Sequence, residues 1–138
     1  MVQRQGKVNV HQVEDVKTDT LTKEITDYIA QQANVFTDEY IGYNKAYFMY
    51  NHQIVHHTYA NGEFVVGNVT TNTIESFWTT IKRGIKEIYH LWSKKHLQLY
   101  LDEFVFRYNT RDKDENWQLN FLLANSTVRT TYKELIYG

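Results

Sequence analysis

The N-terminal part of the chain carries a strand–helix–strand pattern that constrains the fold more than any other feature. Valine residues at near-alternate positions predict a strand over about residues 7–13. Residues 20–33 repeat apolar side chains at helical spacing, and residues 34–37 form a short apolar run typical of a buried strand. Two strands joined by a crossover helix lie parallel in one sheet. The sequence therefore predicts an α/β fold.

The rest of the chain is expected to be mainly helical. A third strand is predicted at about residues 52–58, around Ile54 and Val55. Apolar residues then recur with a period near 3.6, which predicts helices at about residues 72–90, 94–109, 116–124 and 131–136. The expected architecture is a mixed sheet of about three strands with C-terminal helices. A length of 138 residues suits a single domain, residues 1–138.

Composition and charge exclude several kinds of protein. The absence of cysteine excludes disulfides, thiolate metal sites and a cysteine nucleophile. No apolar run approaches the roughly 20 residues of a membrane helix, so we expect a cytoplasmic protein. A net charge of −1 excludes a uniformly basic nucleic-acid-binding protein. Residues 70–96 nevertheless hold five basic and two acidic residues, and the basic ones are Lys82, Arg83, Lys86, Lys94 and Lys95.

This basic segment has two interpretations. A local positive surface can bind phosphate groups even when the whole chain is nearly neutral. The alternative is an ordinary solvated helix face.

Two acidic residues are candidates for metal chemistry. Asp38 directly follows the predicted strand 34–37, and functional groups gather at such strand ends in α/β sheets. Glu75 lies in the first turn of the helix predicted from residue 72. Two-metal phosphoryl transfer uses carboxylates that converge from different elements, and Mg²⁺ prefers oxygen ligands. We therefore predict that Asp38 and Glu75 face each other across a small cavity that holds a divalent ion. The alternative is that Asp38 caps a turn and Glu75 stabilises a helix N-terminus.

Further candidates lie near these two residues. Lys82 follows Glu75 by two helical turns, so both side chains project on nearly the same face. Lys82 could contact a DNA phosphate beside the metal, or it is simply an exposed lysine. Tyr40, Tyr43 and Tyr47 follow Asp38 and could stack on nucleobases, with packing as the alternative.

Several runs of the chain resemble one family of proteins. Residues 35–44, VFTDEYIGYN, resemble the segment around the second aspartate of insertion-sequence DDE transposases of the ISXO-two-like branch. Residues 71–85, TNTIESFWTTIKRGI, resemble the segment that follows it in that family. The runs SKKHL and YLDEFVFRYNTR, within residues 93–111, resemble its next signature, and residues 131–136 resemble its C-terminus. These motifs are specific and occur in the family's order.

The resemblance implies a ribonuclease H-like fold and DNA transposition by metal-dependent strand cleavage and strand transfer, with Mg²⁺ or Mn²⁺ as cofactor. On that resemblance Asp38 matches the second acidic ligand, Glu75 the third, and Lys82 the basic residue two turns later. Branches of the family differ over the third ligand, so Asn72 is a second candidate for it. The implied partner is DNA, both insertion-sequence ends and target, bound by the basic residues named above.

One departure from the family pattern affects the expected activity. The family's first aspartate lies on an opening strand, ahead of the strand that residues 7–13 resemble, and neither Asp15 nor Asp19 replaces it. We therefore expect a ribonuclease H-like domain truncated at the N-terminus, and a poor or inactive transposase when isolated. Its sheet should have an uncovered edge, through which a homo-oligomer could form.

Three functional hypotheses follow. The first is a transposase catalytic-core fragment of the bacterial cytoplasm or nucleoid. The second is a non-catalytic DNA-binding or oligomerising remnant, and the third is a globular remnant without activity.

Overall fold

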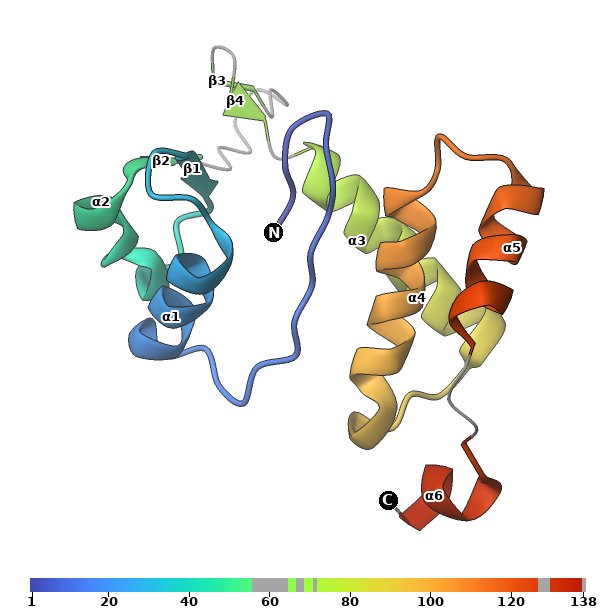
Figure 1. The fold of residues 1–138 in the computed structure, drawn as a ribbon. Coiled ribbons are helices and arrows are strands. Elements are labelled where there is room, and N and C mark those ends of the chain that lie inside the picture. Colours follow the sequence, from blue (N-terminus) through green and yellow to red (C-terminus); the bar gives the residue numbers. More distant parts are fainter. Residues whose placement is uncertain (56–64, 67–68, 71, 127–129, 138) are drawn as a thin grey trace.

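The computed structural model describes residues 1–55, 65–66, 69–70, 72–126 and 130–137. Within this part of the chain, side chains gather into two small hydrophobic cores. One core lies in residues 18–55, called the sheet region below. The other is formed by residues 72–126 together with residues 1–12, called the helical region (Figure 1).

The sheet region is built on two short parallel strands. Helix α1 (Thr18–Tyr28) leads to β1 (Asn34–Thr37), which pairs in parallel with β2 (Asn51–Ile54). A 3-10 turn (Ile41–Tyr43) and the short helix α2 (Ala46–Met49) connect the strands. The buried core consists of Ile25, Val35, Ala46 and Tyr50. The Tyr50 hydroxyl donates a hydrogen bond to the Ile29 carbonyl at 3.1 Å, which ties the start of β2 to the end of α1.

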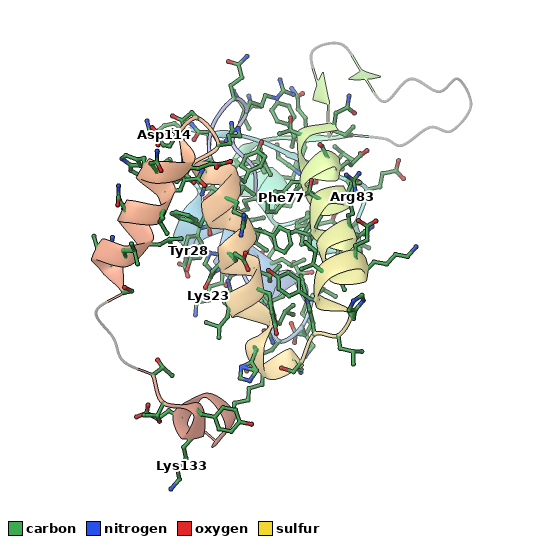
Figure 2. The ribbon with its side chains drawn as sticks, turned by 90° about the vertical axis from the view of Figure 1, so that its right-hand side faces the viewer. Lys23, Tyr28, Phe77, Arg83, Asp114 and Lys133 are labelled. Carbon is green, nitrogen blue, oxygen red and sulfur yellow. The ribbon has the colours of Figure 1, made fainter. Side chains whose placement is uncertain are left out.

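The helical region is built on two helices that lie side by side. Helix α3 (Asn72–Gly84) continues as a π-helical turn (Ile85–Tyr89), and a 3-10 turn (Lys94–His96) then opens α4 (Leu97–Asn109). Helix α3 buries Phe77, Ile81 and Gly84, and Figure 2 shows Phe77 between α3 and α4. A Cβ atom at Gly84 would lie 2.3 Å from the Phe104 ring, so any larger residue there would have to displace that ring from the contact between the two helices. Helices α5 (Glu115–Asn125) and α6 (Tyr132–Tyr137) follow.

The prediction of a strand at residues 7–13 is wrong. The segment is extended, but its only ladder contact within the described residues is an isolated bridge between Val2 and Val8. Side-chain amides of α4 take the place of a neighbouring strand. Asn109 accepts from the Val8 N–H at 2.7 Å and donates to the Val8 carbonyl at 2.9 Å. Gln98 likewise accepts a hydrogen bond from the Gln12 N–H at 2.7 Å and donates one to the Val10 carbonyl at 3.0 Å.

The apolar pattern of that segment therefore reports burial and not a β-ladder. Val8 and Val10 are buried in the helical region with Phe77, Ile81 and Leu101. The α4 amides satisfy backbone groups of Val8, Val10 and Gln12, so among the described residues the extended segment needs only residues 1–3 as a strand-like neighbour.

The expected sheet of about three strands is also not seen. The chain is mixed helix and strand, but the described residues form only the β1–β2 pair and a separate antiparallel pair of β3 (Val65–Val66) and β4 (Val69–Thr70). Because residues 7–13 pack on helices, they add no strand to β1–β2. The third predicted strand, 52–58, corresponds to β2, which ends at Ile54, and residues 56–58 lie outside the described part.

The helix boundaries differ from the predicted ones where the backbone leaves helical geometry. The helix predicted over 20–33 spans Thr18–Tyr28, because Ile29 has an extended conformation with φ −116° and ψ 127°. The helix predicted over 72–90 ends its regular turns at Gly84 and stops at His90, whose φ of 57° cannot continue a helix. No helix in the described ranges is both long and apolar enough to cross a membrane.

Candidate functional site

Asp38 stands at the carboxyl end of β1, as the sequence predicts. Its carboxylate is exposed and accepts a hydrogen bond from the Tyr40 N–H at 3.2 Å, so it also caps the turn that follows the strand. Because β1 and β2 are parallel and Thr37 pairs with Ile54, the carboxyl ends of both strands meet beside it. Burial, and next the negative charge of Asp38, raise the pKa of Tyr43. Turn capping and metal binding are compatible roles, since only one carboxylate oxygen accepts this bond.

His52 on β2 lies beside this strand end, and the sequence analysis did not select it as a candidate. The Thr37 hydroxyl donates to the Asp38 carbonyl at 2.9 Å, so it acts as the acceptor for His52 Nε2 at 2.8 Å. This network assigns the proton to Nε2 and leaves Nδ1 as an acceptor. Burial lowers the pKa of His52, which favours the neutral ring.

The Nδ1 atom of His52 is buried and has no hydrogen-bond partner within the described ranges. The residue as a whole is 8% exposed. No local sequence signal could have revealed this arrangement, because it depends on the register that places β2 beside Thr37.

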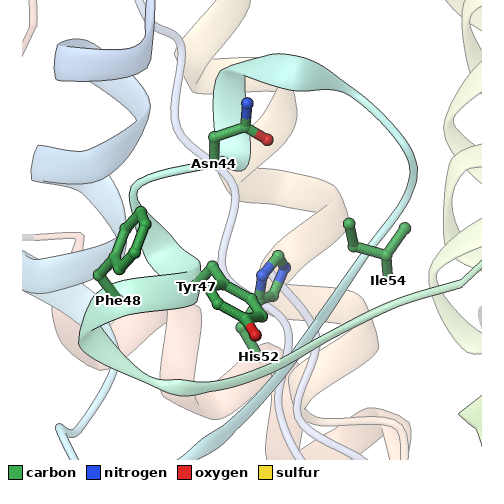
Figure 3. Close-up of a pocket in the computed structure, with 5 residues that line it drawn as sticks. All are labelled: Asn44, Tyr47, Phe48, His52 and Ile54. Carbon is green, nitrogen blue, oxygen red and sulfur yellow. The ribbon is translucent and has the colours of Figure 1, made fainter.

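A pocket of about 290 Å³ lies beside α2 and β2 (Figure 3). His52 lines it together with four residues of α2, β2 and the preceding turn, namely Asn44, Tyr47, Phe48 and Ile54. Of the three tyrosines considered as base-stacking candidates, Tyr47 alone lines this pocket. Tyr40 and Tyr43 contact each other edge to face, with ring centroids 5.9 Å apart.

The remaining candidates lie on α3, which follows β2 later in the chain. Asn72 is the first residue of the helix and Glu75 lies in its first turn, and both are exposed. Lys82 follows in the last turn and is exposed as well. Since Phe77, Ile81 and Gly84 form the buried face, Glu75 and Lys82 project away from the α3–α4 contact.

The basic residues form an exposed series from α3 to the start of α4. Lys82 and Arg83 belong to α3, Lys86 to the π-helical turn, and Lys94 and Lys95 to the 3-10 turn. In Figure 2 Arg83 lies on the outer side of α3, opposite the face that holds Phe77. Where the structure describes the chain, Lys82, Arg83 and Lys86 form no ion pair. Three cations are therefore available for an anionic partner.

The donor set limits what metal site the chain can offer. The described residues contain no group of three or more histidine, cysteine, aspartate or glutamate side chains placed to hold a metal. Mg²⁺ is usually bound through one or two carboxylates, with water and substrate phosphates as the other ligands. The exposed carboxylates of Asp38 and Glu75 fit that chemistry as a pair, and their approach across one cavity stays a prediction.

Comparison with known families assigns the chain to a class. Residues 1–109 match the ISXO2-like transposase domain, which confirms the resemblance seen in the sequence. The match covers most of the chain and includes Asp38, Glu75 and Lys82. This protein therefore belongs to the ISXO2-like transposase domain family. The match ends at the last residue of α4, so α5 and α6 lie outside it. No curated protein and no solved structure matches the chain.

Proposed function

We propose that this chain is part of a ribonuclease H-like catalytic core of a DDE transposase, and that Asp38 and Glu75 hold a divalent cation, Mg²⁺ or Mn²⁺. The observation that carries the proposal is positional. Within the matched residues, one exposed carboxylate ends a strand of the parallel pair and another opens the following long helix. Carboxylates from two elements are what two-metal phosphoryl transfer uses.

The roles of the residues follow from their chemistry. When bound, the divalent ions would activate a water or a 3′-hydroxyl and offset charge on the phosphate. Asp38 and Glu75 would supply carboxylate oxygens, with Asn72 as the alternative to Glu75. Lys82, two turns along the same helix, would hold a DNA phosphate. We place this reaction on DNA in the bacterial cytoplasm or nucleoid.

A further carboxylate is needed for the complete family pattern, and neither Asp15 nor Asp19 fits it. A hydrogen bond from the Thr20 hydroxyl, then bonds from Lys17, lower the pKa of Asp15 to about 2. Asp19 lies in the first turn of α1 and pairs with Lys45. Neither stands at the end of a strand. We infer that the complete reaction needs a carboxylate that neither Asp15 nor Asp19 supplies, and that Asp38 and Glu75 without it support DNA cleavage poorly or not at all.

A second candidate function is non-catalytic DNA binding. It is favoured by three exposed cations that form no ion pair with any residue the structure describes, Lys82, Arg83 and Lys86, on α3 and the π-helical turn. In that case the protein would bind phosphates without metal chemistry, as a monomer or as a homo-oligomer.

Mn²⁺ binding tests the first candidate independently of turnover. Titration of Mn²⁺, followed by electron paramagnetic resonance, should show binding that weakens at least about tenfold in Asp38→Ala and in Glu75→Ala, because each removes an oxygen ligand. Glu87→Ala, which removes an exposed glutamate of the adjoining π-helical turn, is the matched control. Asn72→Ala distinguishes the two candidates for the helix ligand. Equal Mn²⁺ affinity in all four variants would contradict the proposal.

Nicking of a DNA duplex in Mn²⁺ measures any residual activity of the same variants. Activity that is lost in Asp38→Ala and Glu75→Ala but kept in Glu87→Ala supports catalysis. Absence of both Mn²⁺ binding and cleavage, with DNA binding that weakens steeply as salt rises, supports the second candidate. In either case Lys82→Ala should reduce the slope of log affinity against log salt by about 1.

A further inference from the structure

The pocket beside α2 and β2 combines exposed flat rings with a small volume. Phe48 is 85% exposed and Tyr47 65% exposed, and their ring centroids lie 5.5 Å apart at an interplanar angle of 89°. A volume of about 290 Å³ is at the lower end for small-molecule sites and suits one ring system. Aromatic rings of this kind are the surfaces on which nucleobases stack.

Polar atoms in the same pocket match the edge of a base. His52 contributes a buried ring whose Nδ1 acceptor lacks a partner in the described part of the chain. Asn44 is exposed and carries both an amide donor and an amide acceptor. Figure 3 shows the Asn44 amide and the His52 ring among the apolar side chains of the pocket. Apolar faces with a few polar atoms are the usual composition of a site for a flat heteroaromatic ligand.

The position of the pocket links it to Asp38. His52 bonds through Nε2 to the Thr37 hydroxyl, and that hydroxyl bonds to the Asp38 carbonyl. The pocket therefore adjoins the strand end at which we place the metal and the scissile phosphate. A nucleotide whose phosphate lies at Asp38 would have its base within reach of the residues that line this pocket.

We propose that this pocket binds one unstacked nucleobase of the DNA strand whose phosphate lies at Asp38. Tyr47 and Phe48 provide the stacking surface, and His52 Nδ1 accepts a hydrogen bond from an amino or ring N–H group of the base. Side-chain rotation on binding, which is common at interfaces, opens the buried nitrogen to the ligand. This inference rests on the proposed function for the placement of the phosphate.

The test compares pairs of single-stranded oligonucleotides that hold adenine or an abasic site at one position, and this position is moved along the strand from pair to pair. Binding is measured by fluorescence anisotropy in EDTA, so that no metal contributes. We expect the best-placed abasic site to weaken binding at least about fivefold, because one stacked base contributes that much or more. The loss should persist at high salt, since stacking does not depend on counterion release.

The protein variants keep the apolar volume and remove the flat rings. A double variant, Tyr47→Leu with Phe48→Leu, should bind the intact and abasic oligonucleotides equally. Both side chains are exposed, so the fold should be retained, as far-UV circular dichroism will show. Tyr132→Leu, at a tyrosine of α6 that is 77% exposed, is the matched control and should keep the difference.

The contribution of His52 is tested on the ligand, because replacing this buried residue would also remove its hydrogen bond to Thr37. An oligonucleotide with unsubstituted purine in place of adenine lacks the exocyclic amino donor and should bind about threefold or more weakly. Equal binding of the purine and adenine oligonucleotides would contradict the proposed hydrogen bond to His52.

Three results would overturn the pocket assignment. Intact and abasic strands could bind equally at every position, the double leucine variant could keep the difference, or no oligonucleotide could bind. A change in oligomeric state on the double substitution, seen by light scattering, would instead assign the surface to a second copy. Asp38→Ala separates the two proposals, because it should lose Mn²⁺ binding and keep the preference for the intact strand.

Discussion

The two regions of the molecule use aromatic residues in opposite ways. In the helical region, Trp92 stacks on Tyr100 at 5.3 Å and packs with Phe104 against the buried core, and the Tyr89 ring contacts all three. In the sheet region the core is four buried residues, and Tyr47 and Phe48 are left at the surface around a pocket. The rings around Trp92 thus serve packing, whereas the rings of Tyr47 and Phe48 line the pocket to which we assign binding.

The candidate site depends on both regions. Asp38 belongs to the sheet region, whereas Glu75 and Lys82 belong to the helical region. Residues 1–17 run from the α3–α4 core to the start of α1 and so connect the regions (Figure 1). The proposed metal ligands therefore lie in two regions with separate hydrophobic cores. The following substitutions test whether the two regions unfold as one unit.

The largest expected effect comes from the helical core. Ile81 is 2% exposed, and Ile81→Ala should lower the free energy of unfolding by about 2–5 kcal/mol through lost burial and a residual cavity. Ile25→Ala tests the smaller core in the same way. The three tryptophans, Trp78, Trp92 and Trp117, all lie in the helical region, so their fluorescence reports that region alone.

Urea unfolding of both variants is followed by tryptophan fluorescence and by far-UV circular dichroism. Coincident curves would mean that the two regions unfold as one unit. If Ile25→Ala shifts the dichroism curve and leaves the fluorescence curve in place, the regions are independent.

The next effect concerns the segment that replaces the expected strand. Asn109→Leu removes both hydrogen bonds to Val8 and leaves a buried N–H and carbonyl unpaired, which should cost about 1–3 kcal/mol. Asn125→Leu is the control, because the Asn125 amide bonds an exposed carbonyl within α5. Denaturant unfolding and amide hydrogen exchange at Val8 measure the effect. Unchanged protection of the Val8 amide would show that burial alone holds the segment.

A smaller effect is expected in the sheet region. Tyr50→Phe removes the hydrogen bond to the Ile29 carbonyl and keeps the buried ring, so the loss should be about 0.5–1.5 kcal/mol. Tyr132→Phe, at an exposed tyrosine, is the control. A thermal unfolding curve unaltered by Tyr50→Phe would mean that the ring alone joins α1 to β2.

The smallest effect is a pH dependence from His52. Burial lowers the pKa of His52 in the folded protein, so the unfolded chain binds more protons below its ordinary pKa of about 6.5. Stability should therefore decrease as the pH falls from 7 toward 5. His52→Gln should flatten this part of the stability curve, whereas His90→Gln, at an exposed histidine, serves as the control. A slope that survives His52→Gln would assign it to another group.

Local patterns in the sequence were enough to locate most of the secondary structure. Helical periodicity placed α3 and α4, and a short run around Val35 and Phe36 placed β1, because each pattern depends on residues a few positions apart. The motifs around Asp38 and Glu75 were sufficient to recognise the transposase family. The position of Asp38 at the end of β1 also followed from sequence alone.

Tertiary structure decided which groups complete one another. Val8 is extended, as the predicted strand would be. Its backbone N–H and carbonyl are bonded by the side chain of Asn109, 101 positions away, and not by a neighbouring strand. The bond between His52 and Thr37 likewise exists only because β2 pairs with β1 in one register. Periodicity reports which side of a segment is apolar, whereas the partner of a buried polar group is chosen by the packing of distant segments. For this reason the sequence identified the acidic candidates, and only the folded chain revealed the pocket beside one of them.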